Sequence, residues 1–274
     1  MTNPIPTITI IGAGNMGSCL AGGLIANGHP ADKLWISNPS TEKLSRLHKQ
    51  FGIQTTTNNL EAVQHANIVV FAVKPAVFLT VAKECADLIH KKNPLILSIV
   101  TGTRDASIRD WLGQTTPVVR CMPNIPALIG VGATGLFANE CVNEIQHSAA
   151  ESVMRSLGLT VWLSEESQLD IITGLSGSGP AYFFLIMEAL QEAGEKLGLT
   201  PETANLLTLQ TALGAARMAI ESGESLCILR QRVSPPGGTT ERAIEVLEAA
   251  DLRKTILNTV RAAKNRAEEL ANLL

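Results

Sequence analysis

The residues with the clearest chemical use form a glycine pattern, G-x-G-x-x-G, between an apolar run and a helical stretch. In that context the first glycine permits a tight turn, the second lets the backbone approach a pyrophosphate, and the third lets helix and strand pack closely. The free N–H groups at the start of the helix then attract phosphate. The pattern predicts a dinucleotide site, rather than a plain glycine turn, at Gly12, Ala13, Gly14, Asn15, Met16 and Gly17.

The end of the second expected strand bears on the choice between NADH and NADPH. An Asp or Glu there would hold the ribose 2′-hydroxyl and repel a 2′-phosphate, but the chain has no acid between Ser37 and Glu42. Asn38 and Ser40 can donate hydrogen bonds to a phosphate, and Lys43 lies nearby. The sequence therefore favours NADPH and leaves NADH open. Ser40 is also placed to cap the next helix, and the two roles are compatible.

A third group of residues ends a strand and begins a helix at residues 72–75. The carboxyl ends of parallel strands border the ligand crevice in this architecture. Ala72, Val73, Lys74 and Pro75 are therefore expected to border that crevice. The ammonium group of Lys74 either contacts the cofactor or is solvated, and its chemistry alone favours neither alternative.

Two prolines and two glycines precede a helix in the stretch 234–240. The N–H groups of Gly238, Thr239 and Thr240 are predicted to converge at the helix N-terminus, where they would receive a small anion such as a carboxylate. Alternatively the stretch is only a cap, with Thr240 as the N-cap residue. The similar stretch 173–182, rich in glycine and serine, either admits a ligand or marks a tight helix–helix crossing.

Two regions of different texture must position these residues. β-branched and apolar runs predict strands at 7–11, 34–37, 68–73, 95–100 and 118–121. Helical stretches lie between them, at 18–27, 41–51, 75–90 and 143–157. This alternation predicts an α/β fold with a doubly wound, Rossmann-type parallel sheet. Beyond it only helices are expected, at 180–196, 201–222, 240–249 and 252–273. The predicted domains are therefore 1–163 and 164–274, and the nearly all-apolar helix around 206–220 predicts burial in a core or a subunit interface.

Composition excludes several classes of function. The 274 residues carry a net charge of −3, so no basic field drives binding to nucleic acid or an anionic membrane. No apolar run is expected to span a membrane, and the first residues do not read as a signal peptide. The five cysteines are scattered, which indicates reduced thiols in a cytoplasmic protein. No Cys or His pair has the spacing of zinc ligands, so no metal is expected.

Taken in order along the chain, the motifs resemble those of the pyrroline-5-carboxylate reductase family. The glycine loop is common to many enzymes, whereas Leu175–Tyr182 and Val233–Thr240 are specific to this family, with support from 72–75 and 120–124. The resemblance covers essentially the whole chain. It implies a Rossmann domain followed by an all-α C-terminal dimerisation domain, with helices that interlock into a dimer and dimers that assemble further into decamers.

The resemblance also implies a reaction and roles for residues. A hydride would pass from NAD(P)H to the C=N carbon of 1-pyrroline-5-carboxylate, giving proline. Cofactor contacts would fall on the glycine loop, Asn38, Ser40, Asn59 and 72–75. The amides around Gly238, Thr239 and Thr240 would hold the substrate carboxylate, and the Thr240 hydroxyl would reach the ring nitrogen as the catalytic group. Glu166 would lie near the substrate; alternatively it is only a first-turn acid after a Ser164 cap.

Four departures from the family pattern concern the site rather than the fold. They are Pro235 in place of a serine, Ile125 in place of a threonine, the bulkier Val100-Thr101 turn and Arg232 in place of an asparagine. Two other functions compete with the reductase. A β-hydroxyacid dehydrogenase would need a lysine on the first long helix of the second domain, and 180–194 contains none. A non-catalytic, dinucleotide-sensing protein would be supported by the four departures alone.

Overall fold

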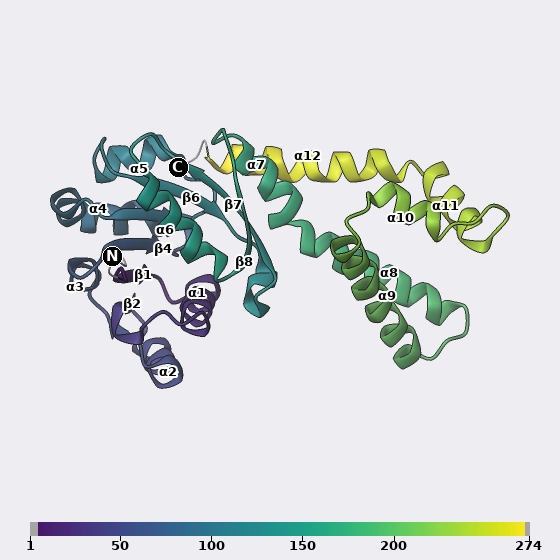
Figure 1. Ribbon diagram of the computed structural model, residues 1–274, viewed down its shortest axis with the longest axis horizontal. Helices are drawn as coiled ribbons and strands as arrows, with labels where there is room; N and C mark the ends of the chain where they lie inside the picture. Colours follow the sequence, from purple (N-terminus) through teal and green to yellow (C-terminus); the bar gives the residue numbers. More distant parts are fainter. Residues whose placement is uncertain (1–4, 272–274) are drawn as a thin grey trace. The chain divides into compact units, whose positions relative to one another are not determined.

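In the computed structural model, which describes residues 5–271, the strands form one eight-stranded sheet (Figure 1). In chain order the strands are β1 (Ile8–Ile11), β2 (Leu34–Ser37), β3 (Gln54–Thr56), β4 (Ile68–Phe71), β5 (Leu95–Ser98), β6 (Val118–Met122), β7 (Gly132–Ala138) and β8 (Gly158–Trp162). They lie in the order β3-β2-β1-β4-β5-β6-β7-β8. The first six pair in parallel, with the strand order of a doubly wound Rossmann sheet, which confirms the predicted fold class.

Three of these strands were not expected from the sequence. β3 is short and polar, and β7 contains two glycines, so neither shows a β-branched run. β7 runs antiparallel to β6, and β8 pairs in parallel with β7. Gly158 was predicted to end a helix but instead opens β8 with a φ of +133°; a Cβ there would lie 2.2 Å from the Gly132 carbonyl oxygen. The sheet is therefore mostly, not wholly, parallel.

Helices cover both faces of the sheet. They are α1 (Asn15–Ala26), α2 (Thr41–Phe51), α3 (Asn59–Gln64), α4 (Pro75–Lys92), α5 (Asp105–Leu112), α6 (Glu144–Arg155) and α7 (Gln168–Ile172). One apolar core joins α1, α2 and α6 to the sheet, and a second joins α3, α4 and α5 to its other face. This division is why the central strands β1 and β4 are buried on both sides.

Local signals explain where several helices begin and end. The Ser40 hydroxyl accepts from the N–H of Lys43 at the start of α2, and Gly52 ends that helix in the left-handed conformation (φ +70°), as predicted. Asn143 and Gln146 form a reciprocal capping box at the start of α6. The short helices α3 and α5 were not predicted; α3 has only six residues, too few for a periodic pattern.

The remainder of the described chain is helical. A π-helical turn (Thr173–Gly177) follows α7, and the further helices are α8 (Gly179–Lys196), α9 (Pro201–Glu221), α10 (Leu226–Arg232), α11 (Thr239–Ala249) and α12 (Leu252–Ala271). Thr200 caps α9, and Pro201 occupies its first position, where its missing N–H costs no hydrogen bond. The last predicted residues of the final helix, 272 and 273, lie outside the described part of the chain.

The described chain divides into two compact units, one of residues 5–178 with 262–271 and one of Gly179–Arg261. The predicted boundary after residue 163 lies one residue beyond the end of β8. The first compact unit continues beyond it because α7 packs against β6 and β7. The end of α12 belongs to the same unit, where a Cβ on Gly102 would lie 3.5 Å from the backbone nitrogen of Ala271.

Large apolar side chains are exposed along the helices of the second unit. Leu206 is 67% exposed, Leu213 54% and Ile220 82%. Within one chain the helix around 206–220 is therefore not buried, so the interface alternative is the one that remains. Contrary to expectation from the sequence, one continuous helical run, Gln168–Lys196, is long and apolar enough to cross a membrane by length and composition. The same criterion is met by apolar helices that pack against protein.

Candidate active site

The glycine loop has the geometry that a dinucleotide needs. Gly12 has a φ of +113°, and a Cβ there would lie 2.5 Å from the Ala72 carbonyl oxygen. A Cβ on Gly17 would lie 2.0 Å from the Gly12 carbonyl oxygen, so the first and third glycines are required by packing. Gly14 is exposed and a Cβ on it would meet nothing within 4 Å, so the second glycine faces open space. That is the side from which a pyrophosphate would approach.

The start of α1 is free to bind an anion. Gly14 is its N-cap residue and no side chain caps the helix, so the first N–H groups are left without a side-chain acceptor. No acidic residue stands in the first turn to compete for them. The loop therefore fits a diphosphate at the helix N-terminus.

The predicted cofactor residues of β1, β2 and β4 converge at one edge of the sheet. The Gly12 N–H donates to the Ser37 carbonyl (2.8 Å), and the Ala13 N–H donates to Asn38 Oδ1 (3.1 Å). The Ala72 N–H donates to the Ile11 carbonyl (2.8 Å). These bonds hold Asn38 and Ala72 on either side of the loop, as the sequence predicted from strand ends.

The remaining predicted cofactor residues lie at the same edge of the sheet, and their side chains differ in how firmly they are held. Asn59 is held at both ends: its Oδ1 accepts from the Ser37 hydroxyl (2.6 Å) and its Nδ2 donates to Glu84 (2.9 Å). Val73 lies beside the loop, with its Cγ1 3.2 Å from a Cβ placed on Gly12. Lys74 and Pro75 are exposed at the start of α4. The structure thus keeps both alternatives for Lys74, cofactor contact and solvation.

The predicted anion site at α11 differs in detail from the expectation. Gly238 is the N-cap residue and Thr240 the second residue of the helix, so the alternative in which Thr240 is the N-cap residue is wrong. The Gly238 N–H donates to the Pro235 carbonyl (3.0 Å), and Gly237 (φ +74°) donates its N–H to Glu241 Oε2 (2.6 Å). The Gly238 amide is therefore engaged within the turn, which leaves the first-turn amides of Thr239 and Thr240 for a ligand.

Two departures from the family pattern lie close to this turn. Arg232 pairs with Glu224, with 2.5 Å between Nη2 and Oε1. Ser234 directly precedes Pro235 in the sequence. Its hydroxyl is buried and makes no hydrogen bond within residues 5–271.

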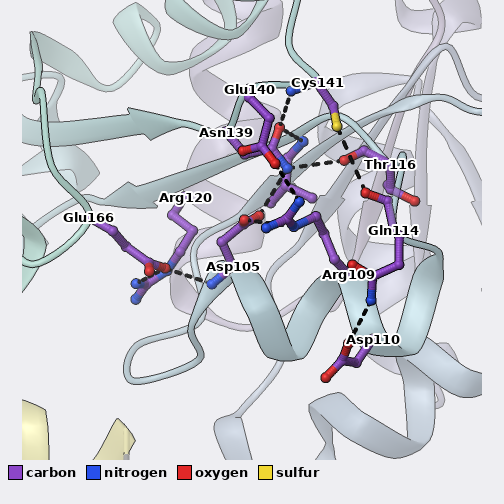
Figure 2. A network of polar contacts seen from close by, with 11 residues as sticks. Asp105, Arg109, Asp110, Gln114, Thr116, Arg120, Asn139, Glu140, Cys141 and Glu166 are labelled. Carbon is purple, nitrogen blue, oxygen red and sulfur yellow. Dashed lines mark hydrogen bonds and ion pairs between the residues drawn. The ribbon is translucent and has the colours of Figure 1, made fainter.

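Glu166 has protein partners in the first unit (Figure 2). Its Oε1 accepts from Nη1 of Arg120 (2.7 Å), which is 95% buried, and from the N–H of Asp105 at the start of α5 (2.6 Å). Glu166 precedes α7, whose N-cap residue is Ser167, so the alternative of a first-turn acid after a Ser164 cap is wrong. The carboxylate instead joins β6 to the N-terminus of α5. Its contact with substrate stays a prediction.

The same network contains a buried carboxylate that sequence reasoning missed. Asp105 forms an ion pair with Arg109 (2.9 Å between Oδ2 and Nε) and accepts a hydrogen bond from Asn139 Nδ2 (3.0 Å). Burial raises the pKa of Asp105, and the Arg109 guanidinium opposes this shift without cancelling it. Arg109 is also paired with Glu140 (2.6 Å), as Figure 2 shows. No local pattern marks this cluster, because its members come from α5 and from the loop that follows β7.

Comparison with known proteins extends over both regions of the chain. Residues 166–270 match the profile "Pyrroline-5-carboxylate reductase dimerisation", and residues 7–102 match "NADP oxidoreductase coenzyme F420-dependent". The chain is similar to the pyrroline-5-carboxylate reductase of Pseudomonas aeruginosa, with 47% identity over 98% of each chain. The apolar run Gln168–Lys196 therefore lies within the matched dimerisation region.

Solved structures agree with this similarity. A pyrroline-5-carboxylate reductase from Coxiella burnetii superposes with a TM-score of 0.95 and 49% identity, covering 98% of this chain and 99% of that one. The pyrroline carboxylate reductase of Plasmodium falciparum, solved with NADP bound, superposes with a TM-score of 0.85 and 30% identity over 97% and 98% of the two chains. Because relatives this similar span the glycine loop and the helical region alike, the chain belongs to the pyrroline-5-carboxylate reductase family.

Proposed function

We propose that the protein reduces the C=N bond of 1-pyrroline-5-carboxylate to give L-proline, the last step of proline biosynthesis. The observation that carries this function is the presence, in one chain of this family, of an open dinucleotide loop at α1 and a glycine-rich helix start at α11. The first suits a diphosphate, and the second suits the carboxylate of a small substrate.

NADPH is the proposed cofactor in preference to NADH. Asn38 Oδ1 is already used by the Ala13 N–H, so the Nδ2 group is the end of the amide left for a ligand, and it can only donate. A donor suits a 2′-phosphate, whereas the acid that would select a 2′-hydroxyl is missing from this strand end. The NADP bound to the Plasmodium relative supports the same choice.

The chain's own part in the reaction is binding, orientation and one proton. When bound, the nicotinamide supplies the hydride. The amides of Thr239 and Thr240 hold the substrate carboxylate, and the Thr240 hydroxyl orients the proton on the ring nitrogen, which makes the imine carbon electrophilic. Most of the rate enhancement comes from positioning, since an imine needs no further acid–base pair once its nitrogen is protonated.

Self-association in the cytoplasm completes the proposal. The exposed apolar side chains of α8 and α9 form a surface that a second copy would cover, and dimers would build decamers. All five cysteines are free, at Cys19, Cys85, Cys121, Cys141 and Cys227, which suits a reducing compartment.

A direct assay tests the function. Purified protein is mixed with NADPH and 1-pyrroline-5-carboxylate, and the loss of NADPH absorbance is followed, with proline quantified as product. Turnover is expected. A parallel assay with NAD and 3-hydroxyisobutyrate tests the dehydrogenase alternative and is expected to show none. Binding of NADPH without turnover of either substrate would instead support a non-catalytic, dinucleotide-sensing protein.

A further inference from the structure

Asn124 joins three segments that are far apart in the sequence. It lies two residues after the end of β6 at Met122 and precedes a 3₁₀ turn (Ile125–Ile129). Its Nδ2 donates to the Ser176 carbonyl in the π-helical turn (3.0 Å), and its Oδ1 accepts from the N–H of Ala133 at the start of β7 (2.8 Å). Both ends of one amide are thus used to fix the π-helical turn to the end of β6.

The Ser176 carbonyl needs this donor because of the local sequence. Ser176 lies where the π-helical turn gives way to α8, and in the α-helical register of α8 the carbonyl of residue 176 would accept from the N–H of residue 180. Residue 180 is a proline, which has no N–H. Asn124 replaces the missing donor from another element, and without it a partly buried carbonyl would lose a hydrogen bond.

The turn that Asn124 holds lies beside the nicotinamide half of the cofactor site. In this fold one half of the dinucleotide lies over β1–β3 and the other over β4–β6, outside the carboxyl ends of the strands. Met122 ends β6 at that edge, and a Cβ on Gly177 would lie 2.7 Å from Met122 Cε. The Thr101 hydroxyl, after β5, contacts Met122 Sδ (3.8 Å). The π-helical turn is therefore packed on the strand ends that border the nicotinamide, and such turns are frequent at functional sites.

We propose that Asn124 is a positioning residue for hydride transfer, which rests on the proposed function. It holds Thr173–Gly177 against Met122, so that the wall of the nicotinamide half keeps one shape during turnover. Asn124 would act through the π-helical turn and would not itself contact the reacting atoms. Its loss should therefore change the chemical step more than the affinity for NADPH.

Asn124→Asp is the sharpest variant. A carboxylate keeps the size of the side chain and the acceptor for the Ala133 N–H, but it sets a negative oxygen against the Ser176 carbonyl in place of the donor. We expect kcat to fall by about 10- to 100-fold, as for a misplaced reaction geometry. The Kd for NADPH should stay within about twofold of the original, and the isotope effect with 4-deuterated NADPH should rise because hydride transfer becomes rate-limiting.

Asn67→Asp is the matched control. Asn67 makes a similar bond to the N–H of Thr7 (2.8 Å), but just before β4, at the opposite edge of the sheet. The same substitution there should leave kcat and the isotope effect unchanged. Equal losses in the two variants, or a lower thermal midpoint of Asn124→Asp with unchanged kcat and isotope effect, would overturn the proposal.

A rescue experiment covers the case in which Asn124→Asp does not fold. Asn124→Ala removes the donor, and Pro180→Ala in the same chain restores an N–H four residues after Ser176. The double variant should recover part of the kcat lost by Asn124→Ala; no recovery in a folded double variant contradicts the role of this hydrogen bond. Lack of turnover by the unaltered protein would contradict the proposed function itself, which separates the two failures.

Discussion

Asn38 has one end of its amide committed to the protein and the other available to a ligand. In Asn38→Asp one carboxylate oxygen still accepts the Ala13 N–H, while the other replaces a donor with a negative acceptor. The variant should accept a hydrogen bond from a ribose 2′-hydroxyl and repel a 2′-phosphate. We expect the ratio of kcat/KM for NADPH over NADH to fall by about 10- to 100-fold, the range of a charge-assisted hydrogen bond.

Asn58→Asp separates this contact from a general effect of charge. Asn58 caps α3 through its Oδ1, and a carboxylate caps equally well, so the variant adds the same charge nearby without changing the predicted contact. Its cofactor ratio should match that of the original protein. An original protein that already prefers NADH would refute the interpretation of Asn38.

Thr240 allows a second test at the same scale. Because Gly238 is the N-cap residue, Thr240→Ala removes no cap, and alanine at this helical position should change stability by less than about 1 kcal/mol. If the hydroxyl orients the imine proton, kcat should fall by about 10²-fold, and Thr240→Ser should keep much of the activity. Thr240→Ala with turnover close to the original would remove the catalytic role.

Proline binding gives an independent reading of Thr240. As the product, proline carries both the carboxylate and the ring nitrogen. Loss of a contact to the nitrogen should weaken its binding about fivefold, or about 1 kcal/mol, while the backbone amides still hold the carboxylate. Unchanged proline affinity in Thr240→Ala would contradict that contact.

Single residues were predictable from sequence where the signal was local. The loop from Gly12 to Gly17 and the strand end at Asn38 each follow from spacing within a few positions. The bond between Asn124 and Ser176 spans 52 residues, and the one between Glu166 and Asp105 spans 61. Such pairs become visible only after the chain has folded, because no local pattern links their members.

At the scale of elements, two glycines at the junction of β1 and α1 have different roles, Gly17 in stability and Gly14 in ligand binding. A Cβ on Gly17 would lie 2.0 Å from a backbone oxygen, so Gly17→Ala must displace α1 and should lower the free energy of unfolding by about 1–3 kcal/mol. Gly14→Ala places its methyl group in open space and should leave stability unchanged in the absence of cofactor.

Gly14→Ala should nevertheless lose cofactor. In Gly14→Ala the methyl group would stand where the pyrophosphate must approach, so we expect about a tenfold or greater loss of NADPH affinity with an unchanged thermal midpoint. Thermal unfolding without cofactor and titration with NADPH check both. Normal NADPH affinity in Gly14→Ala would contradict the placement of the phosphates.

The contact of α5 with the loop after β7 predicts a dependence of stability on pH. Burial raises the pKa of Asp105, so over the range between its ordinary and its raised pKa the folded state binds more protons than the unfolded state. Stability then falls as pH rises through that range. Asp105→Asn should remove this contribution. The thermal midpoint of the variant minus that of the original protein should therefore increase as the pH rises. A constant difference would contradict the raised pKa.

Strands could be predicted where their own sequence is an apolar run. They could not be predicted where pairing with neighbouring strands stabilises them. β1, β2, β4, β5 and β6 lie in the core and show it in their sequence. β7 and β8 are stabilised by pairing with β6 and with each other. Glycine at position 135 of β7 leaves room for Ile172, which packs 3.0 Å from where a Cβ would be. Glycine in a strand lowers the local signal although it fits the packing.

At the scale of the molecule, one of the two compact units of the described chain is built from two separate stretches of sequence. Residues 262–271 of α12 return to the first unit, where Ala267 is buried and Leu270 lies beside Gly102. The sequence shows only that the last region is helical. The unit against which a helix packs depends on contacts between residues about 170 positions apart in sequence. A local sequence pattern does not reveal such contacts.

The helices of the second unit predict that the protein is an obligate oligomer. Leu206 on α9 is 67% exposed and lies among other exposed leucines, a surface that a soluble chain covers with a partner. No folded monomer should persist at micromolar concentration, so light scattering should report a particle of at least twice 29.1 kDa. Leu206→Glu should dissociate it or prevent folding, because a buried, unpaired charge at an interface is costly. Ile145→Glu is the control, since Ile145 on α6 is 70% exposed but lies outside residues 164–274, and the variant should assemble normally. An active particle of 29.1 kDa, or equal dissociation by both variants, would refute an interface built from the helical region.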